Sequence, residues 1–116
     1  MMDKQLTDDG VSKAVFGYCP RFHAAVELIG SRWTGAILLV MLGGASRFST
    51  IHDAIPGLSD RLLSERLREL EAAGVVRRDV SDTKPVTITY TLTDKGQALA
   101  PVVQEILNWS QIWQEI

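Results

Sequence analysis

The stretch LSDRLLSERLRELEAAG, residues 58–74, has the pattern of one amphipathic helix with defined ends. Ser59 can accept a hydrogen bond from a free backbone N–H at the helix start, and Gly74 can adopt the left-handed conformation that ends a helix. With about 100° between successive residues, the apolar face carries Leu63, Leu67 and Leu70. The nearly opposite face is polar and carries Arg61, Ser64 and Arg68. This pattern predicts a helix that packs on a core and presents arginines outward, although an ordinary solvated surface helix would share it.

Two strand patterns follow this helix directly. They are VVRRDV at residues 75–80 and VTITYTL at residues 86–92, joined by the polar segment SDTKP. In the second, apolar side chains alternate with threonines, as in a strand with one buried face. Two strands joined by a short loop predict a hairpin. A helix that runs into a hairpin with Arg77 and Arg78 at its base and Lys84 at its tip has the layout of a winged DNA-binding domain.

A shorter helix is predicted just before this one. It begins around Arg47 and covers residues 49–55, and Pro56 with Gly57 forms a strong turn signal. Two helices joined by a short turn, the second with basic exposed positions, form a helix-turn-helix. The predicted fold is therefore mainly α with a small β-hairpin (α+β), a winged helix-turn-helix domain.

Two more helices are expected upstream. Pro20 suits the first position of a helix that Gly30 ends. Ser31 is then expected to cap a second helix, from residue 32 or 33 to about Leu42. Residues 1–18 are interpreted as a weakly ordered arm, and residues 19–116 as the domain with its C-terminal helix.

The C-terminal segment carries more apolar side chains than one face of a small domain buries. Thr93 is placed to cap its start, and Pro101 forces a kink or a new helix. The apolar residues that follow form a wide seam and include Val102, Ile106, Trp109, Ile112, Trp113 and Ile116. We expect a dimer interface here, because exposed tryptophans are a liability and are enriched at interfaces. The alternative is that this helix closes the domain's own core.

Composition excludes several classes of protein. A chain of 116 residues with 46% hydrophobic and 22% charged residues is typical of one globular domain. Its longest apolar run, residues 36–42, is far shorter than the roughly 20 residues of a membrane span. No secretory signal is evident, so a cytoplasmic protein is expected. No zinc-site spacing, nucleophile motif or phosphate loop is present, so we expect no metal, no cofactor and no enzyme activity.

The charge balance opposes binding to nucleic acid by bulk electrostatics. The net charge is −2, and residues 32–95 carry nine Lys and Arg against eight Asp and Glu. A DNA-binding surface must therefore be a local arrangement of arginines, which a symmetric dimer would double. The net charge also favours an alternative, a winged-helix module that binds protein and not DNA.

The ordered set of motifs resembles the HxlR family of bacterial winged-helix transcriptional regulators, which are MarR-like. The motifs are CP at 19–20, IGSRWT at 29–34, RF at 47–48, IPGLS at 55–59, RLRELE at 66–71, GVV at 74–76 and YTLT at 90–93. The resemblance covers nearly all of residues 19–110. It implies a homodimer built from N- and C-terminal helices, with a recognition helix in the major groove and a wing near the minor groove. It also implies regulation of nearby genes, as repressor or activator, and we favour repression.

The contacts to double-stranded operator DNA are predicted by position. The start of the recognition helix is expected to read bases through Ser59, Asp60, Arg61 and Ser64. Arg68 is better placed for phosphate. Further phosphate candidates are Arg32, Arg47, Ser49, Arg77 and Lys84. Arg66 lies off the basic stripe and is interpreted as structural or ion-paired.

The single cysteine is the candidate for signal input. Cys19 precedes Pro20 at a helix start, where the partial positive charge and the neighbouring Arg21 favour a thiolate. The family resemblance implies sensing of oxidants or electrophiles at such a thiol. The alternatives are a small buried hydrophobic residue at the dimer interface, or control by a small-molecule effector in a pocket between Trp33, Phe22 and the terminal tryptophans. With one cysteine, a redox response requires a disulfide between subunits, a mixed disulfide or alkylation.

Overall fold

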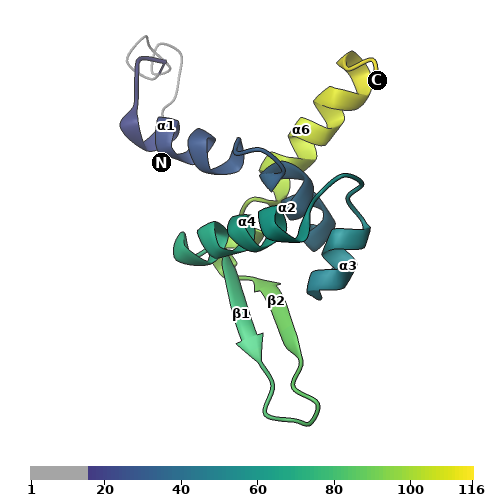
Figure 1. Ribbon diagram of the computed structural model, residues 1–116. Helices are drawn as coiled ribbons and strands as arrows, with labels where there is room; N and C mark the ends of the chain where they lie inside the picture. The colour runs from purple at the N-terminus through teal and green to yellow at the C-terminus, as the bar shows by residue number, and fades with distance from the viewer. Residues whose placement is uncertain (1–15) are drawn as a thin grey trace.

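The chain folds into six helices and one antiparallel hairpin within the part that the computed structural model describes, residues 16–116. The arm expected over residues 1–18 lies outside the described residues except for its last three. In chain order the elements are α1 (Pro20–Ile29), α2 (Thr34–Leu42), α3 (Phe48–Asp53), α4 (Asp60–Ala72), β1 (Val76–Val80), β2 (Ile88–Leu92), α5 (Asp94–Gln97) and α6 (Ala100–Trp113) (Figure 1). The prediction of a mainly helical winged domain is confirmed.

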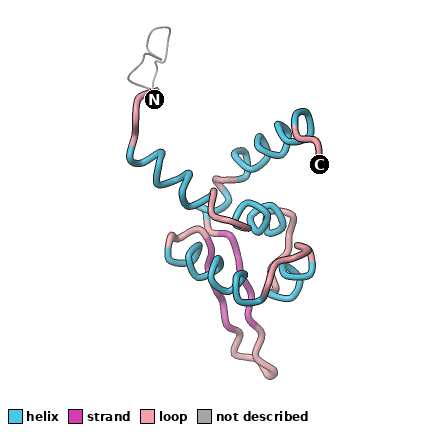
Figure 2. The backbone as a smooth tube through the Cα atoms, turned by 45° about the horizontal axis from the view of Figure 1, so that its top comes forward, coloured by secondary structure: helices cyan, strands magenta, loops and turns pink. Residues whose placement is uncertain are grey.

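Helices α2, α3 and α4 pack together next to the base of the hairpin. The α1 and α6 helices extend away from this body on the side opposite the hairpin tip (Figures 1 and 2). The core is continuous and consists of Ile37, Leu38, Met41, Ile51, Ile55, Leu58, Leu63, Leu67, Leu70, Val75, Val76, Leu92 and Val103. In contrast, α1 contains no buried residue and α6 buries only Val103. The two outer helices therefore add little to the core of a single chain.

The ends of α4 are set by the residues that the sequence indicated. Ser59 precedes the helix, and its Oγ accepts a hydrogen bond from Leu62 N–H at 3.1 Å. Gly74 follows the helix with φ of +78°, the left-handed conformation in which a Cβ would be strained. Thr93 caps α5 in the same way, because its Oγ1 accepts from Gly96 N–H at 3.2 Å. Pro101 lies in the first turn of α6, so the expected break produces a new helix.

The expected start of α2 is wrong. The helix begins at Thr34 and not at residue 32 or 33, and Ser31 does not cap it. Ser31 lies close enough to α1 for its Oγ to donate back to Glu27 O at 3.0 Å. Trp33 adopts a left-handed φ of 78° and turns the chain, and α1 and α2 meet at 77°. A Cβ at Gly57 would contact Cη2 of Trp33 at 3.4 Å, so the indole packs against the turn that precedes α4.

Two smaller boundaries also differ from the prediction. The α3 helix starts at Phe48 and ends at Asp53, before the expected limit at Ile55. Val86 lies outside β2 and is exposed, because the loop closes later than the alternation suggests. Ser81 holds this loop: Ser81 N–H donates to Thr87 O at 2.8 Å, and Thr87 N–H donates to Ser81 Oγ at 2.9 Å.

No single helix among the described residues is long and apolar enough to span a membrane, and α1 and α2 meet that test only together, as a bent pair.

A histidine joins the two helices of the helix-turn-helix. His52 in α3 lies with Nδ1 3.0 Å from Oδ1 of Asp53 and with Nε2 3.3 Å from Oδ1 of Asp60 in α4. The hydrogen bond with Asp53 raises the pKa of His52 above its ordinary value of 6.5, and the negative charges of Asp60 and Asp53 add to it while desolvation opposes it. Protonated His52 therefore stabilises the contact between α3 and the start of α4.

This contact predicts a pH-dependent stability. Because the pKa is raised in the folded chain, the stabilisation is fully present below pH 6.5 and is lost as pH rises through the raised pKa. We expect His52→Asn to lower the free energy of unfolding on the acidic side of this window and to have little effect on the alkaline side. Urea unfolding of both proteins across the window measures the difference. A difference that is constant, or that grows with pH, would contradict the assignment.

Candidate nucleic-acid interface

The polar face of α4 carries four of the residues predicted to contact DNA. Asp60, Arg61 and Arg68 are exposed, and Ser64 is half-buried. Arg61 Nε lies 3.3 Å from Oε2 of Glu65, one turn along the helix. An exposed pair of this kind contributes about 0.3–0.5 kcal/mol, so DNA can replace Glu65 as the partner. Arg61 is therefore available for a bidentate contact to a base.

Two of the predicted base-reading residues already have partners within the protein. Ser59 Oγ accepts the capping hydrogen bond, which leaves its O–H and one lone pair for other contacts. Asp60 interacts with His52 at the turn. The second contact was not predicted from the sequence. The predicted short turn between the helices was the signal that could have revealed it.

Arg66 is ion-paired, as predicted from its position off the basic stripe. Its Nη1 lies 3.0 Å from Oε2 of Glu69, and its Nε donates to the Arg32 carbonyl at 2.8 Å. This hydrogen bond ties α4 to the segment between α1 and α2. The guanidinium of Arg32 itself lies over the Trp33 ring, 5.2 Å from its centroid.

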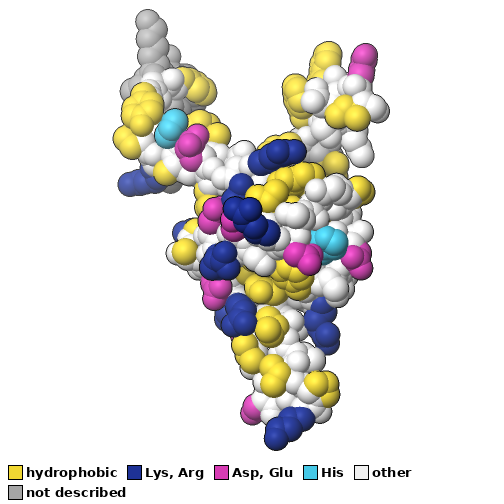
Figure 3. All heavy atoms as spheres, in the orientation of Figure 1, with side chains coloured by type: hydrophobic (Ala, Val, Ile, Leu, Met, Phe, Trp, Pro, Cys, Tyr) yellow, Lys and Arg dark blue, Asp and Glu magenta, His cyan; other side chains and the backbone are white. Residues whose placement is uncertain are grey.

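The remaining basic candidates are spread along α3 and the hairpin. Arg47 precedes α3, Ser49 lies in its first turn, and Lys84 lies in the hairpin loop, all exposed. Arg77 in β1 is paired with Asp79 on the same strand face, with Nε 3.0 Å from Oδ1. Basic side chains follow the face that carries α4 and continue to the hairpin tip, with acidic side chains among them (Figure 3). The charge pattern is thus local and mixed.

Cys19 lies at the start of α1, outside the predicted DNA surface. It is exposed in the single chain, and its Sγ accepts a hydrogen bond from Phe22 N–H at 3.4 Å. The sequence predicted this position at the N-terminus of a helix. The alternative of a thiol buried at a dimer interface concerns a second chain and stays a prediction.

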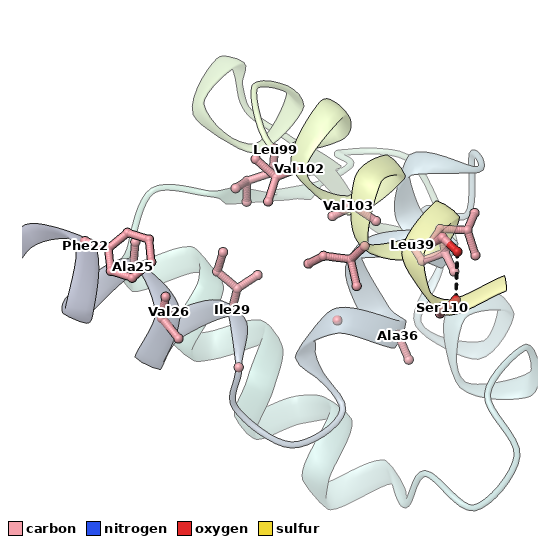
Figure 4. A pocket seen from close by; sticks show the side chains of 14 residues that line it. Phe22, Ala25, Val26, Ile29, Ala36, Leu39, Leu99, Val102, Val103 and Ser110 are labelled. Atoms are coloured by element: carbon pink, nitrogen blue, oxygen red, sulfur yellow. Dashed lines mark hydrogen bonds between the residues drawn. The ribbon is translucent and has the colours of Figure 1, made fainter. Parts of the chain in front are cut away.

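Most large apolar side chains of α6 are exposed, as are Phe22 and Val26 of α1. Trp109 and Trp113 are 55% and 66% exposed, and Ile112 and Ile116 are exposed as well. Next to them is an apolar groove of about 600 Å³ between α1, α2 and α6 (Figure 4). Phe22 lines this groove, but Trp33 and the two terminal tryptophans do not. The effector pocket predicted from the sequence is therefore wrong in its lining residues, apart from Phe22.

Comparison with known proteins agrees with this geometry. Residues 28–116 match the family model described as HxlR-like helix-turn-helix. The chain is 54% identical over 95 residues to the uncharacterized HTH-type transcriptional regulator YvaP of Bacillus subtilis (strain 168), covering 82% of this chain and 88% of YvaP. It is 45% identical over 92 residues to the HTH-type transcriptional regulator YodB of the same organism, covering 79% and 82%.

Solved structures show the same fold. The reduced form of YodB from B. subtilis superposes with a TM-score of 0.75 at 42% identity, covering 85% of this chain and 97% of YodB. The redox regulator HypR in its oxidized form superposes with a TM-score of 0.78 at 33% identity, covering 84% and 100%. Family, relatives and fold agree that this chain belongs to the HxlR-like helix-turn-helix family and is a transcriptional regulator, not an enzyme.

Proposed function

We propose that the protein is a homodimeric repressor that binds double-stranded operator DNA with α4 in the major groove and the hairpin on the flanking backbone or minor groove. The observation that carries the proposal is the division of α4 into two faces. Leu63, Leu67 and Leu70 are at most 1% exposed, whereas Arg61 and Arg68 point away from that buried face. The base-reading start of the helix and the hairpin lie on one body, as groove binding requires.

The homodimer follows from the surface of α6 and α1. Val26, Val102 and Ile106 are exposed and line the apolar groove, and the two terminal tryptophans, farther along α6, are exposed as well. An apolar surface of this extent on a small chain marks an interaction site. A second copy is the occupant we propose, because a symmetric pair buries the same helices of both chains. It also doubles the local set of arginines, which a nearly neutral chain needs in order to bind DNA.

Substitution of Arg61 tests the recognition helix. We expect Arg61→Ala to cost about 1–3 kcal/mol at the cognate operator, because a bidentate contact to a base is lost. Fluorescence anisotropy titration with the DNA upstream of the protein's own gene measures this cost. Arg61→Lys is the matched control: it keeps the charge, so it should retain binding to unrelated DNA and lose discrimination. Unchanged operator affinity of Arg61→Ala would refute the assignment of α4 as the recognition helix. If the wild type showed no salt-dependent binding to DNA, the result would favour the alternative, a winged-helix module that binds protein and not DNA.

Substitution of Ile106 tests the dimer. Ile106→Glu places a carboxylate in the proposed interface but leaves the core of the single chain untouched, because Ile106 is exposed there. We expect sedimentation equilibrium to give a monomer with weakened DNA binding. Gln104→Glu introduces the same negative charge on an exposed position of α6 that does not line the groove and should stay dimeric. A dimeric Ile106→Glu protein, or a monomeric wild type, would contradict the proposal.

We further propose that Cys19 receives an oxidant or electrophile signal. Its exposed thiol supports this, as do the relatives, since YodB has been solved diamide-treated and quinone-bound and HypR both reduced and oxidized. A quinone would add to the thiolate and form a C–S bond, and the ring would take up the proton. Diamide would instead take two electrons and two protons from two Cys19 thiols, which join as a disulfide between subunits.

Operator release after treatment decides the role of Cys19. We expect quinone or diamide to release the wild type from DNA and to leave Cys19→Ser bound, because serine cannot form either product. Anisotropy follows release, and intact mass spectrometry identifies an adduct or a disulfide-linked dimer. Equal release of both proteins would rule out sensing through this thiol.

A further inference from the structure

A polar hollow lies between α4 and the hairpin and has no assigned role. Its volume is about 400 Å³, and its lining residues are Ser64, Leu67, Arg68, Glu71, Arg78 and Tyr90. It is distinct from the apolar groove, which lies between α1, α2 and α6. The hollow thus combines the polar face of α4 with one side chain from each strand of the wing.

The hairpin register explains which side chains enter the hollow. Arg78 in β1 and Tyr90 in β2 are directly opposite each other. Alternation along the strands puts them on the same face as Val76 and Leu92, which are buried against the domain. Arg77 falls on the other face of the hairpin, where it pairs with Asp79. One step along the strand therefore decides which arginine faces α4.

The two arginines of the hollow differ from the others nearby. Arg61, Arg66 and Arg77 each pair with a carboxylate. Among the described residues, Arg68 and Arg78 form no ion pair, although Glu71 lines the same hollow. Two guanidinium groups against one carboxylate leave the hollow positive.

The geometry of a DNA duplex indicates which part of the DNA would lie in this hollow. The major and minor grooves of a duplex are separated by one sugar-phosphate strand. When α4 lies in the major groove and the wing lies at the adjacent minor groove, that strand has to pass between them. The hollow is protein surface that lies between α4 and the wing.

We propose that the hollow is a phosphodiester seat in which Arg68 and Arg78 bind the phosphate and the hydroxyls of Ser64 and Tyr90 donate hydrogen bonds to it. This proposal rests on the proposed DNA binding. It assigns to Arg78 the wing contact that the sequence suggested for Arg77. Glu71 repels phosphate from the C-terminal side of the hollow, so the phosphate sits toward Ser64, one turn before Arg68. A fixed seat sets the rotation of α4 in the groove and hence the register of its base contacts.

Two neighbouring arginines provide a matched test. Arg78→Gln and Arg77→Gln remove the same charge from the same strand, both at exposed positions. We expect Arg78→Gln to weaken binding by about tenfold or more at ~0.1 M salt and to reduce the salt slope by about 2 per dimer, one phosphate in each subunit. The loss should be equal for operator and unrelated duplexes, because phosphate carries no sequence. Arg77→Gln should change both quantities much less, and Tyr90→Phe should show a smaller loss with little change in salt slope.

The controls distinguish a failure of the phosphodiester seat from a failure of the proposed DNA binding on which it rests. Thermal unfolding should give the same melting temperature for both arginine variants. A wild type that binds no duplex would overturn DNA binding and the seat together. A wild type that binds, with equal affinity and slope for Arg78→Gln and Arg77→Gln, would overturn the seat alone. Inorganic phosphate titrated without DNA should give no saturable change in the NMR signals of the Arg78 side chain. A saturable change with unaltered DNA affinity of Arg78→Gln would make the hollow a site for a free anion and would overturn the seat.

Discussion

The burial of one leucine face fixes the orientation of α4, and the rest of the proposed DNA-binding surface depends on it. Leu63, Leu67 and Leu70 are at most 1% exposed and pack in the core formed with α2, α3 and the hairpin base. Burial of a leucine side chain contributes roughly 1.5–3 kcal/mol, far more than any exposed ion pair on the opposite face. The core therefore decides which side chains of α4 point outward, and surface charges adjust to that rotation.

The arginines of this nearly neutral chain differ in whether a carboxylate pairs with them, and this difference separates structural arginines from those available to a ligand. Arg66 is held by Glu69 and the Arg32 carbonyl and serves the fold. Arg61 has a weak, exchangeable partner, whereas Arg68 and Arg78 face a shared hollow. A low net charge is thus compatible with DNA binding, because the useful cations are concentrated between the helix and the wing. The hydrogen bond from Arg66 to Arg32 also connects α4 to the segment after α1, the helix whose N-cap residue is Cys19.

Local signals in the sequence predicted most of the fold. The caps at Ser59, Gly74 and Thr93 act within a few residues of the helix ends that they define, so the sequence could reveal them. The start of α2 could not be predicted in this way, because the left-handed turn at Trp33 accompanies the packing of its indole on Gly57 in a distant segment. The candidate site shows the same division. Helical periodicity predicted that Arg61 and Arg68 are exposed. To decide whether Arg77 or Arg78 faces α4, one must also know which face of the hairpin is buried, and this depends on the packing of Val76 and Leu92. The wide apolar seam of the C-terminal segment indicated an interface on α6, and we propose a second copy of the chain as its partner.

Hydroxyl-radical footprinting of the dimer on its operator tests the central claim most directly, since it maps protected sugars on both strands. A dimer with two copies of α4 in successive major grooves predicts two equivalent protected regions about one helical turn, 10–10.5 base pairs, apart. Within each region, protection should be strongest on the strand between the major groove that holds α4 and the minor groove beside the wing. A single protected region, or protection confined to one groove edge without the intervening strand, would contradict the account.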